Sequence, residues 1–259
     1  MLPRSASVWS LKNMWLWFHK LSSPPTAYAI AGKLRPWFLW PAIALFLWGA
    51  YAALFVVPPD YQQKDSARIM YVHVPASALS LGVYMSMAIA AAVGLIWRIK
   101  VAHALAASLA PIGVALTVLA LFTGAVWGRP MWGTWWAWGD PRIVFTLLNL
   151  FLFLGYMMLR ASFDDTQRAD RMSAVLAIVG SVNVPIVKYS VDWWTSLHQS
   201  ASILKIGTPS IDPSMRWPLL IMAIAYVCYI AAVACDRLRA EILRRERNAS
   251  WLAAALPTK

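Results

Sequence analysis

Two histidines, His73 and His198, are the residues of this sequence best suited to binding chemistry. Each lies among aromatic and apolar residues, His73 in the string RIMYVHVP and His198 in the string YSVDWWTSLHQS. An imidazole nitrogen is the commonest side-chain ligand of metals in proteins. If the second string is helical, Trp194 and His198 lie four residues apart on one side of the helix. A lone histidine in a loop is usually an ordinary surface residue. The indication of a binding site therefore comes from the two histidines together.

Between the two histidines lies a Trp-rich segment, residues 127–142, which reads WGRPMWGTWWAWGDPR. Tryptophan has a flat apolar face and one N–H donor, so several of them at a membrane surface can form a shelf for a flat aromatic ligand. The alternative is an interfacial belt that anchors two helices at headgroup depth. Glycines between the rings weaken the belt interpretation, because a belt needs no extra backbone freedom. Both interpretations stay open for the five rings, Trp127, Trp132, Trp135, Trp136 and Trp138.

Two histidines beside a flat aromatic shelf favour haem as the ligand. Haem iron accepts imidazole on both axial sides, the porphyrin packs on aromatic rings, and the propionates pair with basic side chains. Zinc needs further ligands, for which only Asp192 or Asp140 is at hand, so zinc is disfavoured. Basic residues also reach out to lipid headgroups, and this is the alternative role for the three candidate propionate partners, Arg68, Arg129 and Arg142.

Asp140 has a simpler explanation than direct contact with a ligand. Aspartate at an N-cap, followed by Pro141 at the first helical position and then Arg142, is a typical helix start. Capping alone therefore accounts for Asp140, and ligand contact is the alternative. The other two histidines, His19 and His103, fall in segments predicted to lie on the opposite side of the membrane, where a solvated histidine needs no special role.

Composition places the chain among membrane proteins. Of its 259 residues 60% are hydrophobic and only 13% are charged. The net charge of +12 does not indicate a nucleic-acid partner, because the basic residues lie between apolar runs. Cys228 and Cys235 are seven residues apart in a predicted helix, about 10 Å, which is too far for a disulfide. The sequence has no C-x-x-C-H motif, so the chain is not itself a c-type cytochrome.

Six apolar runs are each close to the roughly 20 residues that a helix needs to cross a bilayer. They predict an all-α membrane protein, a six-helix bundle in one domain over residues 37–235. Residues 1–36 are predicted to be an amphipathic interfacial segment without a signal-peptide pattern, and residues 236–259 a basic tail. The fifth run is the weakest, because it is short and contains Asn183 and Pro185. The runs are Trp37–Val57, Pro75–Trp97, Ala104–Val126, Ile143–Leu159, Met172–Val187 and Trp217–Cys235.

The distribution of Lys and Arg predicts the orientation of this bundle. Segments on the side of the two termini carry more than twice as many basic residues as the segments on the other side. The positive-inside rule therefore predicts that both termini are cytoplasmic. All three loops with unusual chemistry then open on the outer face of the membrane.

The three loop strings, RIMYVHVPAS, WGRPMWGTWWAW with its following Asp and Arg, and YSVDWWTSLHQS, resemble the signatures of the heme exporter protein C family. This family belongs to the Trp-rich haem-handling superfamily of cytochrome c maturation. The resemblance runs in order from about Trp37 to Cys235. It implies a multi-pass bacterial inner-membrane protein that holds haem b on its periplasmic face, with His73 and His198 as axial ligands. The implied platform is Trp132, Trp135, Trp136 and Trp138, which Trp127, Trp194 and Asp140 extend.

The resemblance also implies a role and partners. The chain would present haem to the membrane-anchored haem chaperone of the pathway, together with an ABC transporter membrane subunit, its ATPase and a small single-span subunit. No nucleophilic triad or paired carboxylates are visible, so the chain is predicted not to be an enzyme. In the family pattern Asp follows Trp directly, whereas here Gly139 separates Trp138 from Asp140. The N-terminal 30 or so residues are longer than the family needs.

Three other functions are alternatives to haem delivery. A b-type electron-transfer subunit would place its histidines inside the spans, whereas both candidates lie at helix mouths. A cytochrome c haem lyase or synthase of the same superfamily would also bind apocytochrome, and such relatives usually have more spans and more histidines. A pore or transporter normally shows ionisable groups within its spans, and here polar residues within the spans are few. Haem delivery therefore ranks first.

Overall fold

The computed structural model describes residues 22–199 and 211–252, and within these residues the membrane-spanning segments are all helical. Six helical segments are long and apolar enough to cross a membrane, which confirms the predicted six-span all-α fold. Three of the six spans each consist of two consecutive helical elements. In chain order the elements are α2 (Pro24–Tyr51), the π-helical turn η1 (Ala52–Val56), the 3-10 turn η2 (Asp65–Ile69), α3 (Met70–Trp97), α4 (Lys100–Trp132), α5 (Pro141–Ala161), α6 (Thr166–Gly180), α7 (Asn183–Trp193) and α8 (Pro213–Arg245).

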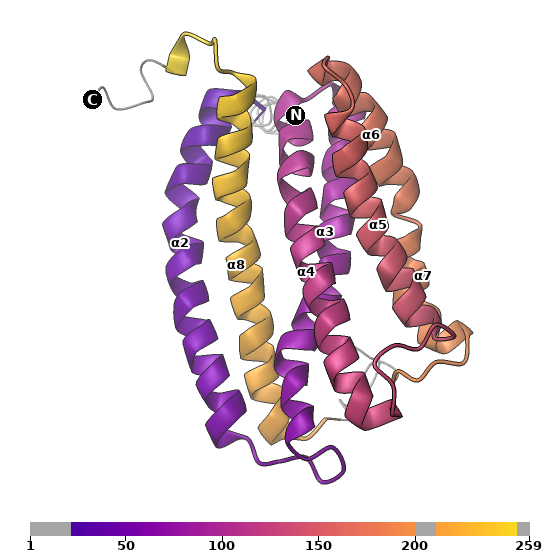
Figure 1. Cartoon of the computed structure of the whole chain (residues 1–259). Coiled ribbons are helices and arrows are strands. Elements are labelled where there is room, and N and C mark those ends of the chain that lie inside the picture. Colours follow the sequence, from indigo (N-terminus) through magenta and orange to yellow (C-terminus); the bar gives the residue numbers. More distant parts are fainter. Residues whose placement is uncertain (1–21, 200–210, 253–259) are drawn as a thin grey trace, which may run out of the picture.

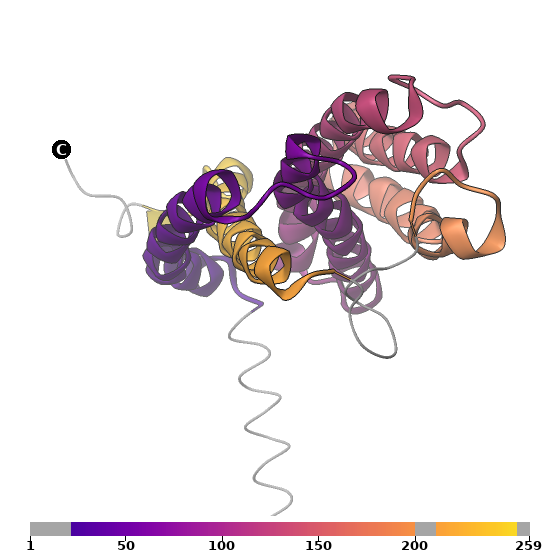
Figure 2. The same cartoon turned by 90° about the horizontal axis from the view of Figure 1, so that it is seen from below.

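The helices form an elongated bundle in which α3 and α4 lie in the middle (Figure 1). Helices α2 and α8 pack along each other on one side of this central pair, and α5, α6 and α7 cover the other side, as the view along the bundle also shows (Figure 2). The connections after η1, α4 and α7 all lie at one end of the bundle. We call this the site end, because it brings together the three segments singled out in the sequence.

The first and last spans are longer than the apolar runs predicted. Helix α2 begins at Pro24 rather than Trp37, so residues 24–36 are helical turns, while residues 1–21 of the predicted interfacial segment lie outside the described residues. Helix α8 continues from Pro213 to Arg245, well beyond Cys235. Polar contacts hold the two extensions together: the Arg35 guanidinium lies 2.9 Å from the Asp236 carboxylate, and Arg239 donates to the Tyr28 hydroxyl at 2.9 Å.

Two boundaries near the site also differ from the prediction. Helix α4 does not end at Val126 but runs through Trp132, so the first part of the Trp-rich segment is helical. It ends at Gly133, whose φ of +75° lies in the left-handed region that glycine adopts without a Cβ clash. The predicted fifth span is two helices, α6 and α7, which meet at residues 181–182.

Close packing between helices in the middle of the bundle supports the site end. The Tyr84 and Phe153 rings pack edge to face with centroids 4.8 Å apart, joining α3 to α5. The Phe153 ring also lies directly against Gly113 of α4, at a place where any side chain would overlap it. Large apolar side chains that point away from this core, as expected for a surface in contact with lipid, include Trp37, Trp40, Phe55 and Phe122.

A set of ion pairs closes the bundle at the end opposite the site. The Arg160 guanidinium lies 2.8 Å from the Glu241 carboxylate, and Arg245 lies 2.7 Å from Asp170. All four side chains are largely buried. Because each buried charge faces an opposite charge, the network avoids the cost of an unpaired ion and links α5, α6 and α8.

The contact between Gly113 and Phe153 gives a prediction for stability. We expect Gly113→Ala to destabilise the protein by about 1–3 kcal/mol, because the added methyl group must displace the Phe153 ring. Gly82→Ala in α3 is the matched control, since no atom apart from the neighbouring backbone of its own helix lies within 4 Å of the position its Cβ would take. Thermal unfolding in detergent checks both variants. Equal melting temperatures for the two would contradict this account of the core.

Candidate functional site

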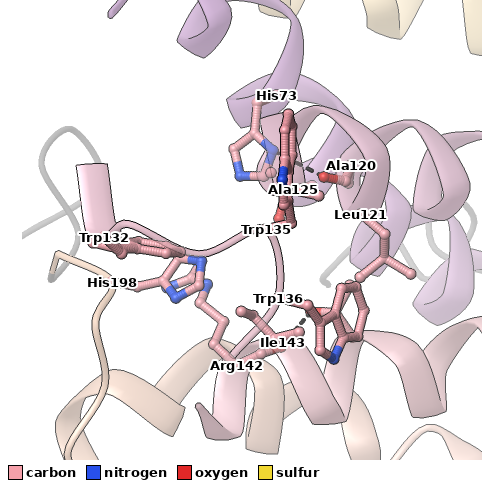
Figure 3. Close-up of a pocket in the computed structure, with 13 residues that line it drawn as sticks. His73, Ala120, Leu121, Ala125, Trp132, Trp135, Trp136, Arg142, Ile143 and His198 are labelled. Atoms are coloured by element: carbon pink, nitrogen blue, oxygen red, sulfur yellow. Dashed lines mark hydrogen bonds between the residues drawn. The ribbon is translucent and has the colours of Figure 1, made fainter. Parts of the chain in front are cut away.

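A pocket at the site end brings the two histidines and part of the Trp-rich segment together (Figure 3). About 430 Å³ of space that no atom of the protein fills lies within it, and part of this space is open to the outside. Its walls come from α3, α4, α5, the connection after α4 and the connection after α7. The lining residues are His73, Ser77, Ala120, Leu121, Gly124, Ala125, Trp132, Trp135, Trp136, Arg142, Ile143, Thr146 and His198.

His73 lies in the first turns of α3, and its ring is fixed from the side of α4. Its Nδ1 lies 3.0 Å from the Ala120 carbonyl oxygen and 3.1 Å from the Thr123 hydroxyl. The Thr123 hydroxyl donates its own proton to the Leu119 carbonyl at 2.6 Å, so both partners of Nδ1 act as acceptors. The proton must therefore be on Nδ1, and Nε2 of a neutral His73 keeps its lone pair.

His198 comes from an irregular connection, because α7 ends at Trp193. The backbone of Trp194 is extended, and its ring packs against Phe145 with centroids 5.7 Å apart. The string is therefore not helical from Trp194 to His198, and the condition for pairing these two residues on one side of a helix is not met. The irregular backbone has a physical reason. The Asp140 carboxylate accepts hydrogen bonds from the Ser196 hydroxyl and the Leu197 N–H, both at 2.7 Å, and so holds this connection against the start of α5.

The same Asp140 carboxylate contacts the His198 ring and caps α5. His198 Nδ1 lies 3.2 Å from Asp140 Oδ1, which also accepts the Ile143 N–H at 3.1 Å. The predicted N-cap role of Asp140 is thus confirmed. Burial raises the pKa of the carboxyl, but the hydrogen bonds from Ser196 and Leu197, with the other partners, outweigh burial and hold it below its usual range. The group is an ionised, fully buried acceptor.

Burial also decides the charge of the His198 ring. It lowers the pKa of His198 more strongly than the neighbouring Asp140 carboxylate raises it, and the positive charge of Arg142 lowers it further. The ring is therefore neutral near pH 7. Since the ionised carboxylate can only accept, Nδ1 carries the proton and Nε2 keeps its lone pair. Within the described residues, neither Nε2 of His73 nor Nε2 of His198 has a hydrogen-bond partner.

The tryptophans of the segment divide into those that line the pocket and those that support it. Trp132 packs edge-on against His198 with centroids 4.8 Å apart, and Trp135 and Trp136 are the other two rings in the lining. Trp138 packs against Trp136 and is 72% exposed. Trp127 lies beside His73, where its indole N–H donates to the Gln63 side chain at 3.0 Å. Trp127, Trp138 and Trp194 are not among the lining residues.

The three candidate arginines have different surroundings. Arg142 lines the pocket, close to Asp140 and His198. Arg68 donates to the Ala53 carbonyl and pairs with Asp65 at 2.9 Å, and Arg129 donates to the Gly133 carbonyl. Only Arg142 of the three therefore contributes to the pocket wall.

Several lining residues were not singled out from the sequence. A Cβ on Gly124 would lie 2.9 Å from Cε1 of His73, so this glycine makes room for the ring. Ser77 and Thr146 add hydroxyls to the wall. Helical spacing is the signal that could have found the hydroxyls, since Ser77 follows His73 by four residues and Thr146 follows Arg142 by four. In the described part of the chain no group of three or more His, Cys, Asp or Glu could hold a metal ion, which gives zinc no support.

Comparison with known proteins identifies relatives over nearly the whole chain. The model of the family described as heme exporter protein C matches residues 17–253. Heme exporter protein C of Haemophilus influenzae is 43% identical over 245 residues, which cover 95% of this chain and 99% of the relative. The Escherichia coli K12 protein of the same name is 42% identical, covering 92% and 96%. That of Bradyrhizobium diazoefficiens is 44% identical, covering 87% and 85%.

The close approach of Gly124 to His73 predicts energetic coupling between these residues. We expect Gly124→Ala to destabilise the otherwise unchanged protein by about 1–3 kcal/mol, because the new methyl group crowds the ring. In a His73→Ala background the same change should cost little, since the ring is gone. Thermal unfolding of the four proteins in detergent measures the difference.

Gly155→Ala is the control for this cycle, because its Cβ would lie at an ordinary 3.6 Å from Leu176. We expect its effect to be the same with and without His73. Additive effects of Gly124→Ala and His73→Ala would show that the glycine does not make room for the ring.

Proposed function

The chain belongs to the heme exporter protein C family, and we propose that it binds haem in the pocket between His73 and His198 and hands it on during cytochrome c maturation. The observation that carries the proposal is that two imidazoles line one pocket together with flat aromatic rings, and that neither Nε2 has a hydrogen-bond partner among residues 22–199 and 211–252. The chain acts as a binding and delivery subunit in this proposal, and we assign it no catalytic residue.

The donor set of the pocket fits haem better than a bare metal ion. The protein offers two nitrogen ligands, and a metal ion alone would need two or more further side chains, which the described residues do not supply. Haem brings four equatorial nitrogens of its own and needs only axial ligands. His73 and His198 would be those ligands, and Trp132, Trp135 and Trp136 would contact the porphyrin.

The position of the pocket suits a ligand that must be released. It lies at the site end of the bundle and is partly open, and the rings of Trp135 and Trp138 beside it are 58% and 72% exposed. A b-type electron-transfer subunit would hold its haem between histidines inside the spans, whereas His198 lies in a connection outside them. Two axial imidazoles can be exchanged one at a time by a ligand from a partner, so holding and release are both possible.

The location and partners of the chain follow as part of the same proposal. The excess of basic residues on the side of the termini supports cytoplasmic termini and a pocket on the periplasmic face of the bacterial inner membrane. There the exposed aromatic rim would meet the membrane-anchored haem chaperone. We assign the remaining partners, an ABC transporter membrane subunit with its ATPase and a small single-span subunit, by family membership. We take the haem to be haem b, which needs no covalent attachment to this chain.

The optical spectrum of the purified protein tests the proposed ligands. We expect haemin added to the wild type to give a low-spin bis-imidazole spectrum, and we expect His73→Ala and His198→Ala each to abolish it or convert it to a high-spin spectrum. His19→Ala, which changes a histidine outside the described residues, is the control and should leave the spectrum unchanged. A wild-type protein without low-spin haem, or a spectrum indifferent to both substitutions, would refute the axial assignment.

A second prediction separates the three arginines. We expect Arg142→Gln to weaken haemin binding about tenfold or more, because Arg142 is the one of the three that lines the pocket and a charge-assisted hydrogen bond contributes roughly 1.5–3 kcal/mol. Arg129→Gln is the matched control, since the Arg129 guanidinium already donates to the Gly133 carbonyl. Titration with haemin, monitored through the quenching of tryptophan fluorescence, measures both affinities. Equal losses in the two variants would remove Arg142 from the propionate site.

A further inference from the structure

We propose that Asp140 is a positioning residue for His198, and that its carboxylate makes the two axial imidazoles of the pocket unequal. This inference rests on the proposed function, because it concerns how the chain prepares its own ligands for haem. Asp140 itself is not among the residues that line the pocket. Its effect on a bound haem would therefore pass through His198 rather than through direct contact.

Both oxygens of the Asp140 carboxylate accept hydrogen bonds. Oδ2 accepts from the Ser196 hydroxyl and the Leu197 N–H at 2.7 Å each, and Oδ1 accepts from the Ile143 N–H at 3.1 Å and from His198 Nδ1 at 3.2 Å. The side chain is 1% exposed. A buried carboxylate with donors on both oxygens is held in one orientation, so it can fix the direction of the ring that it contacts.

The contact also selects the tautomer of His198. A carboxylate with this donor set can only accept, so Nδ1 of the ring must be the nitrogen that carries hydrogen. Nε2 is then the nitrogen left for the pocket, with Trp132 packed edge-on at a centroid distance of 4.8 Å limiting how far the ring can swing. In the absence of the carboxylate, the proton of a neutral imidazole can move to Nε2. A protonated Nε2 has no lone pair with which to coordinate iron.

The hydrogen-bond partners of the His73 ring are neutral, whereas the partner of the His198 ring is an anion. Nδ1 of His73 donates to the Ala120 carbonyl and the Thr123 hydroxyl. Hydrogen bonding of Nδ1–H to an anion raises the electron density of the imidazole more than hydrogen bonding to a neutral oxygen does. His198 is therefore the stronger electron donor of the two. The exchangeable position in a hand-over to a partner would be that of His73.

The test uses three variants of the full-length chain. Asp140→Ser removes the contact with His198 but keeps a side chain that caps helices well. Asp140→Asn keeps the side-chain volume and a residue type that caps helices, and it replaces the anionic carboxylate by a neutral amide, whose NH₂ group donates where one carboxylate oxygen accepted. Ser196→Ala is the control: it removes another hydrogen bond to the same carboxylate and the one that the Ser196 hydroxyl accepts from the His198 backbone N–H, and it leaves the contact of Asp140 with the His198 ring in place.

The first readout needs no haem. With only four histidines in the chain, ¹⁵N-labelled histidine side chains can be assigned by single substitutions, and their nitrogen shifts report which nitrogen carries hydrogen. We expect His198 to lose its Nδ1–H tautomer in Asp140→Ser, with His73 unchanged in the same spectrum and both rings unchanged in Ser196→Ala. A His198 tautomer that persists in Asp140→Ser, or changes equally in Ser196→Ala, would overturn the proposal.

The second readout uses haemin. We expect Asp140→Ser to weaken haemin binding roughly ten- to a hundredfold, the usual cost of losing a ligand's hydrogen-bond partner. We expect Asp140→Asn to raise the midpoint potential of the bound haem, because the ligand loses its anionic partner. An unchanged potential in Asp140→Asn would overturn the inequality of the two ligands. If the wild type binds no haemin, the proposed function fails, while the tautomer measurement still decides whether Asp140 positions His198.

Discussion

The buried carboxylate of Asp140 is the interaction on which the arrangement of the site depends. An ionised group removed from water needs hydrogen bonds to replace those it has lost, and here the donors come from the start of α5 and from the connection after α7. Satisfying this one charge therefore joins two segments more than fifty residues apart in the chain. The irregular backbone that carries His198 has its place because of this requirement, not because of any helical preference of its own.

The rest of the bundle supplies a rigid support for this centre. Packing of Phe153 against Gly113 and Tyr84 brings α3, α4 and α5 close together beneath the pocket, and buried ion pairs among α5, α6 and α8 close the opposite end. His73 is held by a backbone carbonyl of α4, so its position follows from the packing of α3 on α4. One proposed ligand is thus part of the helical core, and the other is part of a connection tied to it by a single carboxylate.

The tryptophans that looked alike in the sequence have separate parts in the structure. Trp132 and Trp135 face the pocket, whereas Trp127 supports His73 from the side and uses its indole N–H on Gln63. The shelf and the belt are therefore not exclusive interpretations of the segment: some rings line the pocket and others stay at its rim. A similar division holds for the arginines, of which Arg142 alone among the three candidates lines the wall.

The sequence by itself determined the class of protein, the six spans and the three segments that meet at one end, because apolar runs of bilayer length and their alternating connections leave few other folds. It also identified the N-cap at Asp140, since capping depends on neighbours within one turn. Only the tertiary structure decided which rings face the pocket, that Gly124 makes room for His73, and that Asp140 holds His198. These contacts join residues of different segments, and their geometry depends on how α3, α4 and α5 pack, which no local pattern of residues contains.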